Sequence, residues 1–255
     1  MRVDRPDEGE TVPARADAPE PHQAAASESE IPQARPERAP GDAAARTERA
    51  LENRAEVDGA YRAYAIDRAY ERVREIEQNT ITPAMRRIEA EDPDRHLAGL
   101  DHRLKGRDRL DEKVTAAMTE RVRTADQALA TIKDAIRYTF CYPDGQYTDG
   151  VYADCRRLES TGFERVERRN SWAHEEYKGI NSRWRDPESG QLFEVQFHTQ
   201  ASFEAKQETH WAYEKLRDPA TSKAEQEAMS AYQRKVCVRI PIPPRATDIP
   251  DYRYP

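Results

Sequence analysis

A carboxylate, an amide and an imidazole recur at every second position late in the chain. They belong to Glu194, Gln196 and His198. The residues that alternate with them are apolar, namely Phe193, Val195 and Phe197. This period of two is the pattern of a β-strand with one buried face, because successive side chains of a strand point to opposite sides. The three polar groups are therefore predicted to lie in line on the other face of that strand.

Asp134 supplies a second carboxylate, just before another predicted strand at 135–142. Two carboxylates that converge from neighbouring strands can hold Mg²⁺, which prefers oxygen ligands and is often completed by substrate phosphates. The alternative interpretation is a solvated sheet face with scattered charges. The pattern alone leaves both open for Asp134 and Glu194.

A spaced group of cations stands where a predicted loop enters a helix. Arg103, Lys105 and Lys113 are its members. Arginine binds phosphate through paired hydrogen bonds, lysine acts as a point charge, and a helix start adds free backbone donors. The group therefore suits an anion site. The competing interpretation is an ordinary charged surface helix, since Asp111 and Glu112 lie among the cations.

Two aromatic positions flank the polar strand in sequence. Tyr177 stands two residues before Gly179, whose missing side chain would let a ligand approach, so that the ring could stack on a planar base. His210 and Trp211 fall on a predicted helix. The plainer interpretations are a half-buried tyrosine in an edge strand and a structural histidine.

The pattern of the whole chain predicts an α+β domain with a mixed sheet of about five strands, flanked and preceded by helices. Helices are expected over about 46–79, 82–92, 110–122, 124–132, 151–161, 202–217 and 221–235. Strands are expected over about 135–142, 163–168, 178–184, 191–198 and 236–240. The helix at 124 should begin with a capping box formed by Thr124 and Gln127.

Composition divides the 255 residues further. Residues 1–45 contain seven of the 17 prolines and no Leu, Phe, Tyr or Trp, so we expect a disordered Pro/Ala/Glu-rich tail. A helical segment at 46–100, a catalytic domain at 101–245 and a C-terminal tail at 246–255 should follow. Cys141, Cys155 and Cys237 are expected to be buried free thiols.

Charge and hydropathy limit the partners. The net charge of −7 argues against broad nucleic-acid binding by the whole chain. No run of 18 apolar residues and no secretory signal is visible, so we expect a cytoplasmic protein without a membrane span, or an effector exported by another route.

Taken in order, these motifs resemble the synthetase domain of RelA/SpoT-type alarmone synthetases. That family has an Arg, a Lys two positions later and a Lys ten positions after the Arg, as in Arg103, Lys105 and Lys113. Its tyrosine motif is similar to residues 176–181, and its Glu-Val-Gln strand to residues 194–199. Its His-Trp pair and its strand arginine correspond to His210-Trp211 and Arg137.

The resemblance implies a nucleotidyltransferase-like fold and a magnesium-dependent transfer of pyrophosphate from ATP to the 3'-hydroxyl of an acceptor nucleotide. It implies ATP binding by Arg103, Lys105, Lys113 and Arg137, and metal binding and catalysis by Asp134 and Glu194. The acceptor is expected to contact Tyr177, Asn181, Gln196, His198 and His210.

The sequence also departs from the family pattern. Asp134 lies three residues before Arg137 rather than five, which keeps it on the same side of the strand. His198 replaces a family arginine and Asn181 replaces a family histidine. These changes leave the acceptor open between GDP or GTP, ADP or ATP, and the 3' end of a tRNA.

The expected activity is therefore that of a nucleotide pyrophosphokinase that makes alarmones of the (p)ppGpp or (p)ppApp type, as in a stringent response. One alternative is a toxin that depletes adenine nucleotides or modifies tRNA ends, with an antitoxin protein as its partner. Another is a catalytically inactive nucleotide-binding module, consistent with the shifted Asp134 and the replaced arginine at His198.

Overall fold

The computed structural model describes residues 40–121 and 124–254. The chain divides into two units, residues 1–49 and 50–255, and the second contains the sheet. Of the segment 1–45 that we expected to be disordered, residues 40–45 belong to the first helix. The remainder of that segment lies outside the described residues.

A six-stranded mixed sheet forms the centre of the second unit, in the order β1-β2-β5-β4-β3-β6. Its strands are β1 (His96–Ala98), β2 (Arg137–Tyr142), β3 (Glu164–Asn170), β4 (Ile180–Arg185), β5 (Leu192–Thr199) and β6 (Tyr252–Arg253). Strands β2 and β5 run parallel, and the other neighbours run antiparallel. The α+β class predicted from the sequence is confirmed.

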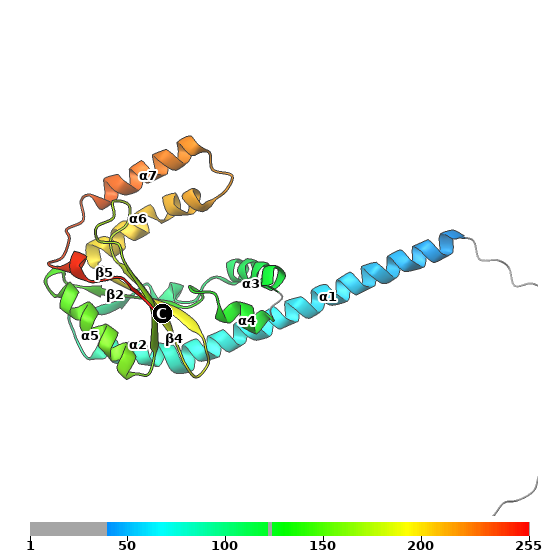
Figure 1. The fold of residues 1–255 in the computed structure, drawn as a ribbon, viewed down its shortest axis with the longest axis horizontal. Coiled ribbons are helices and arrows are strands. Elements are labelled where there is room, and N and C mark those ends of the chain that lie inside the picture. The colour runs from blue at the N-terminus through cyan, green and yellow to red at the C-terminus, as the bar shows by residue number, and fades with distance from the viewer. Residues whose placement is uncertain (1–39, 122–123, 255) are drawn as a thin grey trace, which may run out of the picture. The chain divides into compact units, whose positions relative to one another are not determined.

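Helices lie on both sides of this sheet (Figure 1), with α2 and α5 on one side and α6 on the other, and α7 packs against α6. The helices are α1 (Pro40–Ile76), α2 (Thr82–Ala90), α3 (Arg107–Arg121), α4 (Ala125–Ala130), α5 (Tyr147–Ser160), α6 (Gln200–Arg217) and α7 (Lys223–Cys237). A π-helical turn, Glu77–Ile81, joins α1 to α2. Within the described residues, none of these helices combines the length and the apolar composition that a membrane span requires.

The alternating pattern of the central strands separates a core face from a polar face. On β2, Tyr138 and Phe140 are buried in the hydrophobic core, together with Phe193 and Phe197 of β5. Apolar residues of α1, the π-helical turn and α2 pack into this core, among them Val73, Ile81 and Met85. The helical segment at 46–100 therefore supports the sheet, and it also supplies the edge strand β1.

The C-terminal region differs from its prediction. A strand at 236–240 is wrong, because α7 continues to Cys237 from a capping box that Ser222 forms with Glu225. The expected tail at 246–255 buries Ala246 and Ile249 and adds β6 to the edge of the sheet. Both β1 and β6 are too short to show an alternating pattern in sequence.

The three cysteines are free and buried, as predicted. Burial raises the pKa of Cys141 to about 12. The capping box of Thr124 and Gln127 is also confirmed, at the start of α4. These thiols therefore contribute packing, since a thiol rather than a thiolate is neither a strong nucleophile nor a metal ligand.

Candidate active site

The polar face of the sheet lines a cleft of about 1870 Å³. Strands β2, β3, β4 and β5 contribute polar residues to it, and α3 and α6 contribute others. Sites for one small molecule usually have a volume of roughly 300–1,000 Å³. The cleft is therefore large enough for two nucleotide-sized ligands at once.

Charged side chains of alternating sign form one row across the cleft. Arg137 of β2 is in register with Glu194 of β5, which is in register with Arg183 of β4. Arg183 is in turn opposite Glu167 of β3 and forms an ion pair with it. Opposite charges at facing positions stabilise neighbouring strands. Because Arg183 is engaged by Glu167, Arg137 is the cation that holds Glu194.

Glu194 has two oxygens in different surroundings. Its Oε1 accepts a hydrogen bond from Arg137 Nε at 3.1 Å and another from Gln196 Nε2 at 2.5 Å. Its Oε2 accepts none from the described residues. The side chain lines the cleft, although the residue as a whole is only 8% exposed. One oxygen is thus fixed while the other remains available to a ligand.

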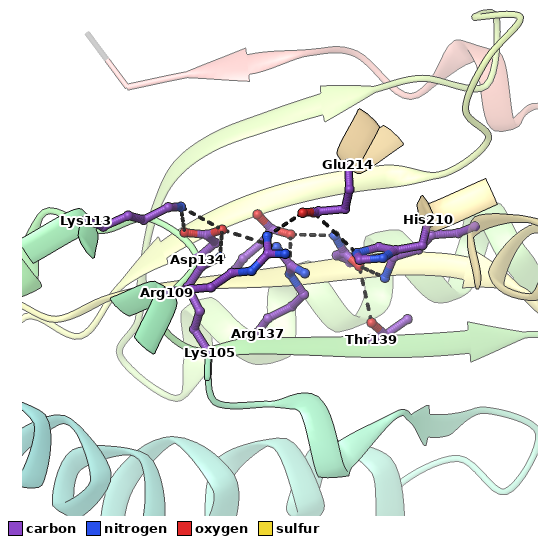
Figure 2. Close-up of polar contacts among 11 residues, drawn as sticks. Lys105, Arg109, Lys113, Asp134, Arg137, Thr139, His210 and Glu214 are labelled. Atoms are coloured by element: carbon purple, nitrogen blue, oxygen red, sulfur yellow. Dashed lines mark hydrogen bonds and ion pairs between the residues drawn. The ribbon is translucent and has the colours of Figure 1, made fainter. Parts of the chain in front are cut away.

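Asp134 is surrounded by cations from a loop, from α3 and from β2 (Figure 2). Lys105 Nζ lies 2.7 Å from its Oδ2, and Lys113 Nζ lies 2.9 Å from its Oδ1. Arg137 Nη2 is 3.5 Å from Oδ2. Burial alone would raise the pKa of Asp134, but the two lysine hydrogen bonds outweigh it and hold this pKa well below the usual range. The predicted ATP-binding lysines and the predicted metal-binding aspartate therefore form one cluster.

The two carboxylates fit a magnesium ion that is completed by substrate phosphates. Asp134 and Glu194 both contact the guanidinium of Arg137, through its Nη2 and its Nε respectively, which places the two carboxylates near each other. Within the residues that the structure describes, no group of three or more His, Cys, Asp or Glu gathers as a metal site. Mg²⁺ does not need such a group, because one or two carboxylates together with phosphate and water oxygens are its usual ligands.

Arg103 is not brought to the cleft. Its Nε lies 2.7 Å from Oε1 of Glu77, a fully buried carboxylate in the π-helical turn. Arg103 follows the short 3₁₀ turn Leu100–His102 with a helical backbone, and its side chain is not part of the cleft lining. Lys105 lines the cleft, and Arg103 points to the core side of the sheet instead.

Tyr177 is held edge-on against His198. The two ring centroids are 5.5 Å apart at an angle of 89°, and the Tyr177 hydroxyl lies 2.9 Å from Nε2 of His198. The same hydroxyl donates to Oδ1 of Asn181 at 2.8 Å. Burial, with a contribution from the charge of Lys206, lowers the pKa of His198 well below its usual value. A neutral His198 therefore lies behind Tyr177, outside the cleft lining, while Tyr177 and Asn181 face the cleft.

His210 lies on α6 at the mouth of the cleft, exposed to solvent. Figure 2 shows it beside Glu214, whose Oε1 is 3.7 Å from His210 Nε2. Glu214 also forms an ion pair with Arg109 of α3. The hydrogen bond from Arg109 lowers the pKa of Glu214. This contact joins α3 to α6 across the mouth, and it was not predicted from the sequence.

Lys206 is the most informative residue that the sequence did not single out as a site residue. Its Nζ lies 2.5 Å from Oε1 of Gln196, inside the cleft. The available signal was its position on one helical face with Phe203 and His210. Arg169 also lines the cleft, at the position of β3 that faces Asn181. Of the arginines in β3, only Arg169 lies in the cleft lining.

No protein-family model matches the sequence, and no curated protein matches it. Similar solved structures include the small alarmone synthetase 1 from Bacillus subtilis, with a TM-score of 0.43 and 17% identity over 66% of this chain and 86% of that chain. The same protein bound to its product pppGpp gives 0.43 and 18%, over 66% and 87%. A GTP pyrophosphokinase family protein from Streptococcus pneumoniae gives 0.38 and 16%, over 74% and 90%.

Proposed function

We propose that this protein transfers pyrophosphate from ATP to the 3'-hydroxyl of an acceptor nucleotide and releases AMP. The observation that carries the proposal is the environment of Glu194. One of its oxygens is fixed by Arg137 and Gln196, and the other is free toward a cleft that also contains Asp134 and its lysines. This arrangement suits a base beside a polyphosphate, and the motifs of the sequence resemble the corresponding family.

The triphosphate of ATP would bind at Lys105, Lys113 and Arg137. These three cations contact Asp134 in one cluster, and they would donate to the phosphate oxygens from there. When bound, Mg²⁺ held by Asp134 and Glu194 would neutralise charge that develops on the phosphates. Arg103 is not part of this proposal, because Glu77 engages it on the core side.

Glu194 would orient the acceptor 3'-hydroxyl through its free oxygen and accept its proton. The hydroxyl oxygen bonds to the β-phosphorus of ATP, and the bond from that phosphorus to the α,β-bridging oxygen breaks, so that AMP leaves. Positioning and electrostatic stabilisation supply most of the rate in such transfers. Arg137 contacts both carboxylates, so its guanidinium would stabilise the negative charge that develops on the leaving AMP.

The acceptor base would stack on Tyr177, whose ring is fixed in orientation by His198 and Asn181. Arg169 has no ion pair with the described residues and lies next to Asn181, so it suits a phosphate of the acceptor. This half of the cleft is separate from the Asp134 cluster, with Glu194 between them.

The test is a reaction of the purified protein with ATP, Mg²⁺ and each acceptor in turn: GDP, GTP, ADP, ATP and deacylated tRNA. AMP and the pyrophosphorylated acceptor are measured by chromatography and mass spectrometry. Glu194→Gln should be silent, and Glu227→Gln, an exposed glutamate of α7, should match the wild type. The absence of AMP with every acceptor would rule the proposal out in favour of a nucleotide-binding module, which would still bind ATP.

Growth on induction separates a toxin from a housekeeping synthetase. Arrest of growth that disappears in Glu194→Gln would favour a toxin, and the product identified by mass spectrometry would show whether nucleotides or tRNA ends are modified. Unaffected growth with clear synthesis of an alarmone would favour a signalling enzyme.

A further inference from the structure

Lys206 reaches the cleft from α6 and is engaged by an amide rather than by an acid. Its Nζ lies 2.5 Å from Oε1 of Gln196 and 5.5 Å from the centre of the Phe203 ring. Lys206 forms no ion pair with the described residues, although Glu194 is close enough to influence it. A charged ammonium without a carboxylate partner in a half-buried position costs stability, so it requires an explanation.

The amide of Gln196 has one orientation that satisfies both of its neighbours. Its Oε1 accepts from Lys206 and, at 3.4 Å, from the Thr139 hydroxyl. Its Nε2 donates to Oε1 of Glu194 at 2.5 Å. An ammonium has donors only and a carboxylate has acceptors only. If the amide were reversed, it would set donor against donor at Lys206 and acceptor against acceptor at Glu194.

The orientation of this amide determines which oxygen of Glu194 is free. Gln196 Nε2 and Arg137 Nε both bond to Oε1, and the described residues give Oε2 no donor. A reversed amide would repel Oε1 and allow the carboxylate to rotate. The acceptor hydroxyl would then lose a base of defined direction.

We propose that Lys206 is a positioning residue that fixes the Gln196 amide and thereby keeps one oxygen of Glu194 directed at the acceptor hydroxyl. The proposal rests on the proposed pyrophosphate transfer for its kinetic part and on the three side chains alone for its structural part. The competing role for Lys206 is direct binding of a phosphate, which would act on ATP affinity and would not need Gln196.

A double-mutant cycle separates these roles. Lys206→Met should lower kcat about 10- to 100-fold, with the KM for ATP changed by less than about twofold, because a misdirected base costs turnover rather than binding. In a Gln196→Leu background the same substitution should lower kcat by less than about threefold, since Lys206 acts through Gln196. Lys206→Arg should restore part of the activity, and Lys215→Met, on the exposed side of α6, should match the wild type.

Two kinetic outcomes would overturn the proposal. One is a double variant whose loss of kcat equals the product of the losses in Lys206→Met and Gln196→Leu, because the two residues would then act independently. The other is a higher KM for ATP with kcat unchanged, which would make Lys206 a phosphate ligand.

A measurement that does not depend on catalysis separates this test from the test of the proposed function. The side-chain amide signals of Gln196, assigned by their loss in Gln196→Leu, should titrate with a midpoint near pH 8 and should stop titrating in Lys206→Met. Burial, and next the charge of Arg137, lower the pKa of Lys206 to about 8, while Glu194 and Cys141 oppose this. His198 and Cys141, the other titratable groups facing Lys206, have pKa values far from 8.

If these amide signals titrate but the wild type makes no AMP, the proposed transfer fails and the structural role of Lys206 stands. If they do not respond to Lys206, the positioning role is wrong even in an active enzyme.

Discussion

Two glutamates, one on the core side of the sheet and one on the cleft side, are each bonded through one oxygen but differ in access. Glu77, on the core side, accepts hydrogen bonds through Oε1 from Thr82, Arg103 and Tyr138, and its buried Oε2 has no partner among the described residues. Glu194, on the cleft side, is also bonded through Oε1 and also leaves Oε2 without a donor. Oε2 of Glu77 is buried, whereas Oε2 of Glu194 faces the cleft.

The difference shows that a paired carboxylate with a spare oxygen is not by itself a site. Adjacent residues of one strand serve both clusters, since Arg137 points to Glu194 and Tyr138 points to Glu77. A buried ion pair contributes little net stability, but removing one partner leaves a charge uncompensated. We therefore expect Glu77 to matter for folding and Glu194 to matter for turnover.

The largest effect should come from Glu194→Gln. The amide keeps the shape and still receives a hydrogen bond, but it cannot accept the proton of the acceptor hydroxyl, so kcat should fall by about 10³-fold. The midpoint of thermal unfolding should change little. Release of AMP in single-turnover experiments checks the first point and calorimetry checks the second. Near-normal turnover would show that the free oxygen of Glu194 is not used.

The corresponding substitution on the core side is Glu77→Gln. It removes the charge that pairs with Arg103 and places an amide nitrogen at the buried position of Oε2. We expect the free energy of unfolding to fall by about 2–3 kcal/mol, below the full cost for a buried pair because the Arg103 side chain is 34% exposed and can reach water. Denaturant unfolding measures this, and kcat per folded molecule should stay within about twofold. A large loss of kcat would instead place Arg103 and Glu77 in the catalytic machinery.

The same comparison shows what the sequence could predict. Alternation identified β2 and β5 and placed Glu194 on the polar face, because period two survives wherever a strand is regular. The spaced group of cations was less informative, because Lys105 and Lys113 line the cleft whereas Arg103 pairs with Glu77 on the core side. The spacing of cations is therefore weaker information than the alternation of a whole strand.

Contacts between distant segments were beyond prediction from the sequence. Lys206 meets Gln196, and Glu77 meets Arg103 and Tyr138, only after the helices pack on the two faces of the sheet. In sequence Lys206 is one polar residue on a helix, and Glu77 is one charge among many in a helical segment. The helical face that Lys206 shares with Phe203 and His210 was a weak signal, and no local pattern distinguishes Glu77 from a solvated side chain.

Gly179→Ala should disturb only the acceptor half of the cleft. Gly179 has φ +148°, and an added Cβ would lie 2.6 Å from Cε1 of His198. Because His198 holds Tyr177 edge-on, the KM for the acceptor should rise about tenfold, and strain should cost about 2 kcal/mol of stability. ATP binding, measured by calorimetry, should be unchanged. Gly145→Ala, which meets no atom within 4 Å, is the matched control; equal effects of both variants would contradict the role of His198.

The smallest effect should be a gain in stability, in Lys206→Met at neutral pH. The pKa of Lys206 is lowered to about 8 in the folded protein, from 10.5 for an ordinary lysine. Below pH 8 the folded state therefore carries an unfavourable charge, and wild-type stability should rise as the pH increases from about 8 to 10.5, where the unfolded chain binds more protons. Removing the charge should stabilise the protein by about 1–3 kcal/mol at pH 7.

This gain should shrink across the same pH range, and Lys215→Met, which removes an exposed charge, should show neither the gain nor its pH dependence. Thermal unfolding at pH 7 and pH 10 measures both variants. A gain in stability together with a loss of kcat would show that Lys206 is retained for function against its cost to the fold, in contrast to Glu77, whose charge supports the fold. A loss of stability at pH 7 would mean that Lys206 holds the cleft together, and the contrast between the two faces would not extend to this residue.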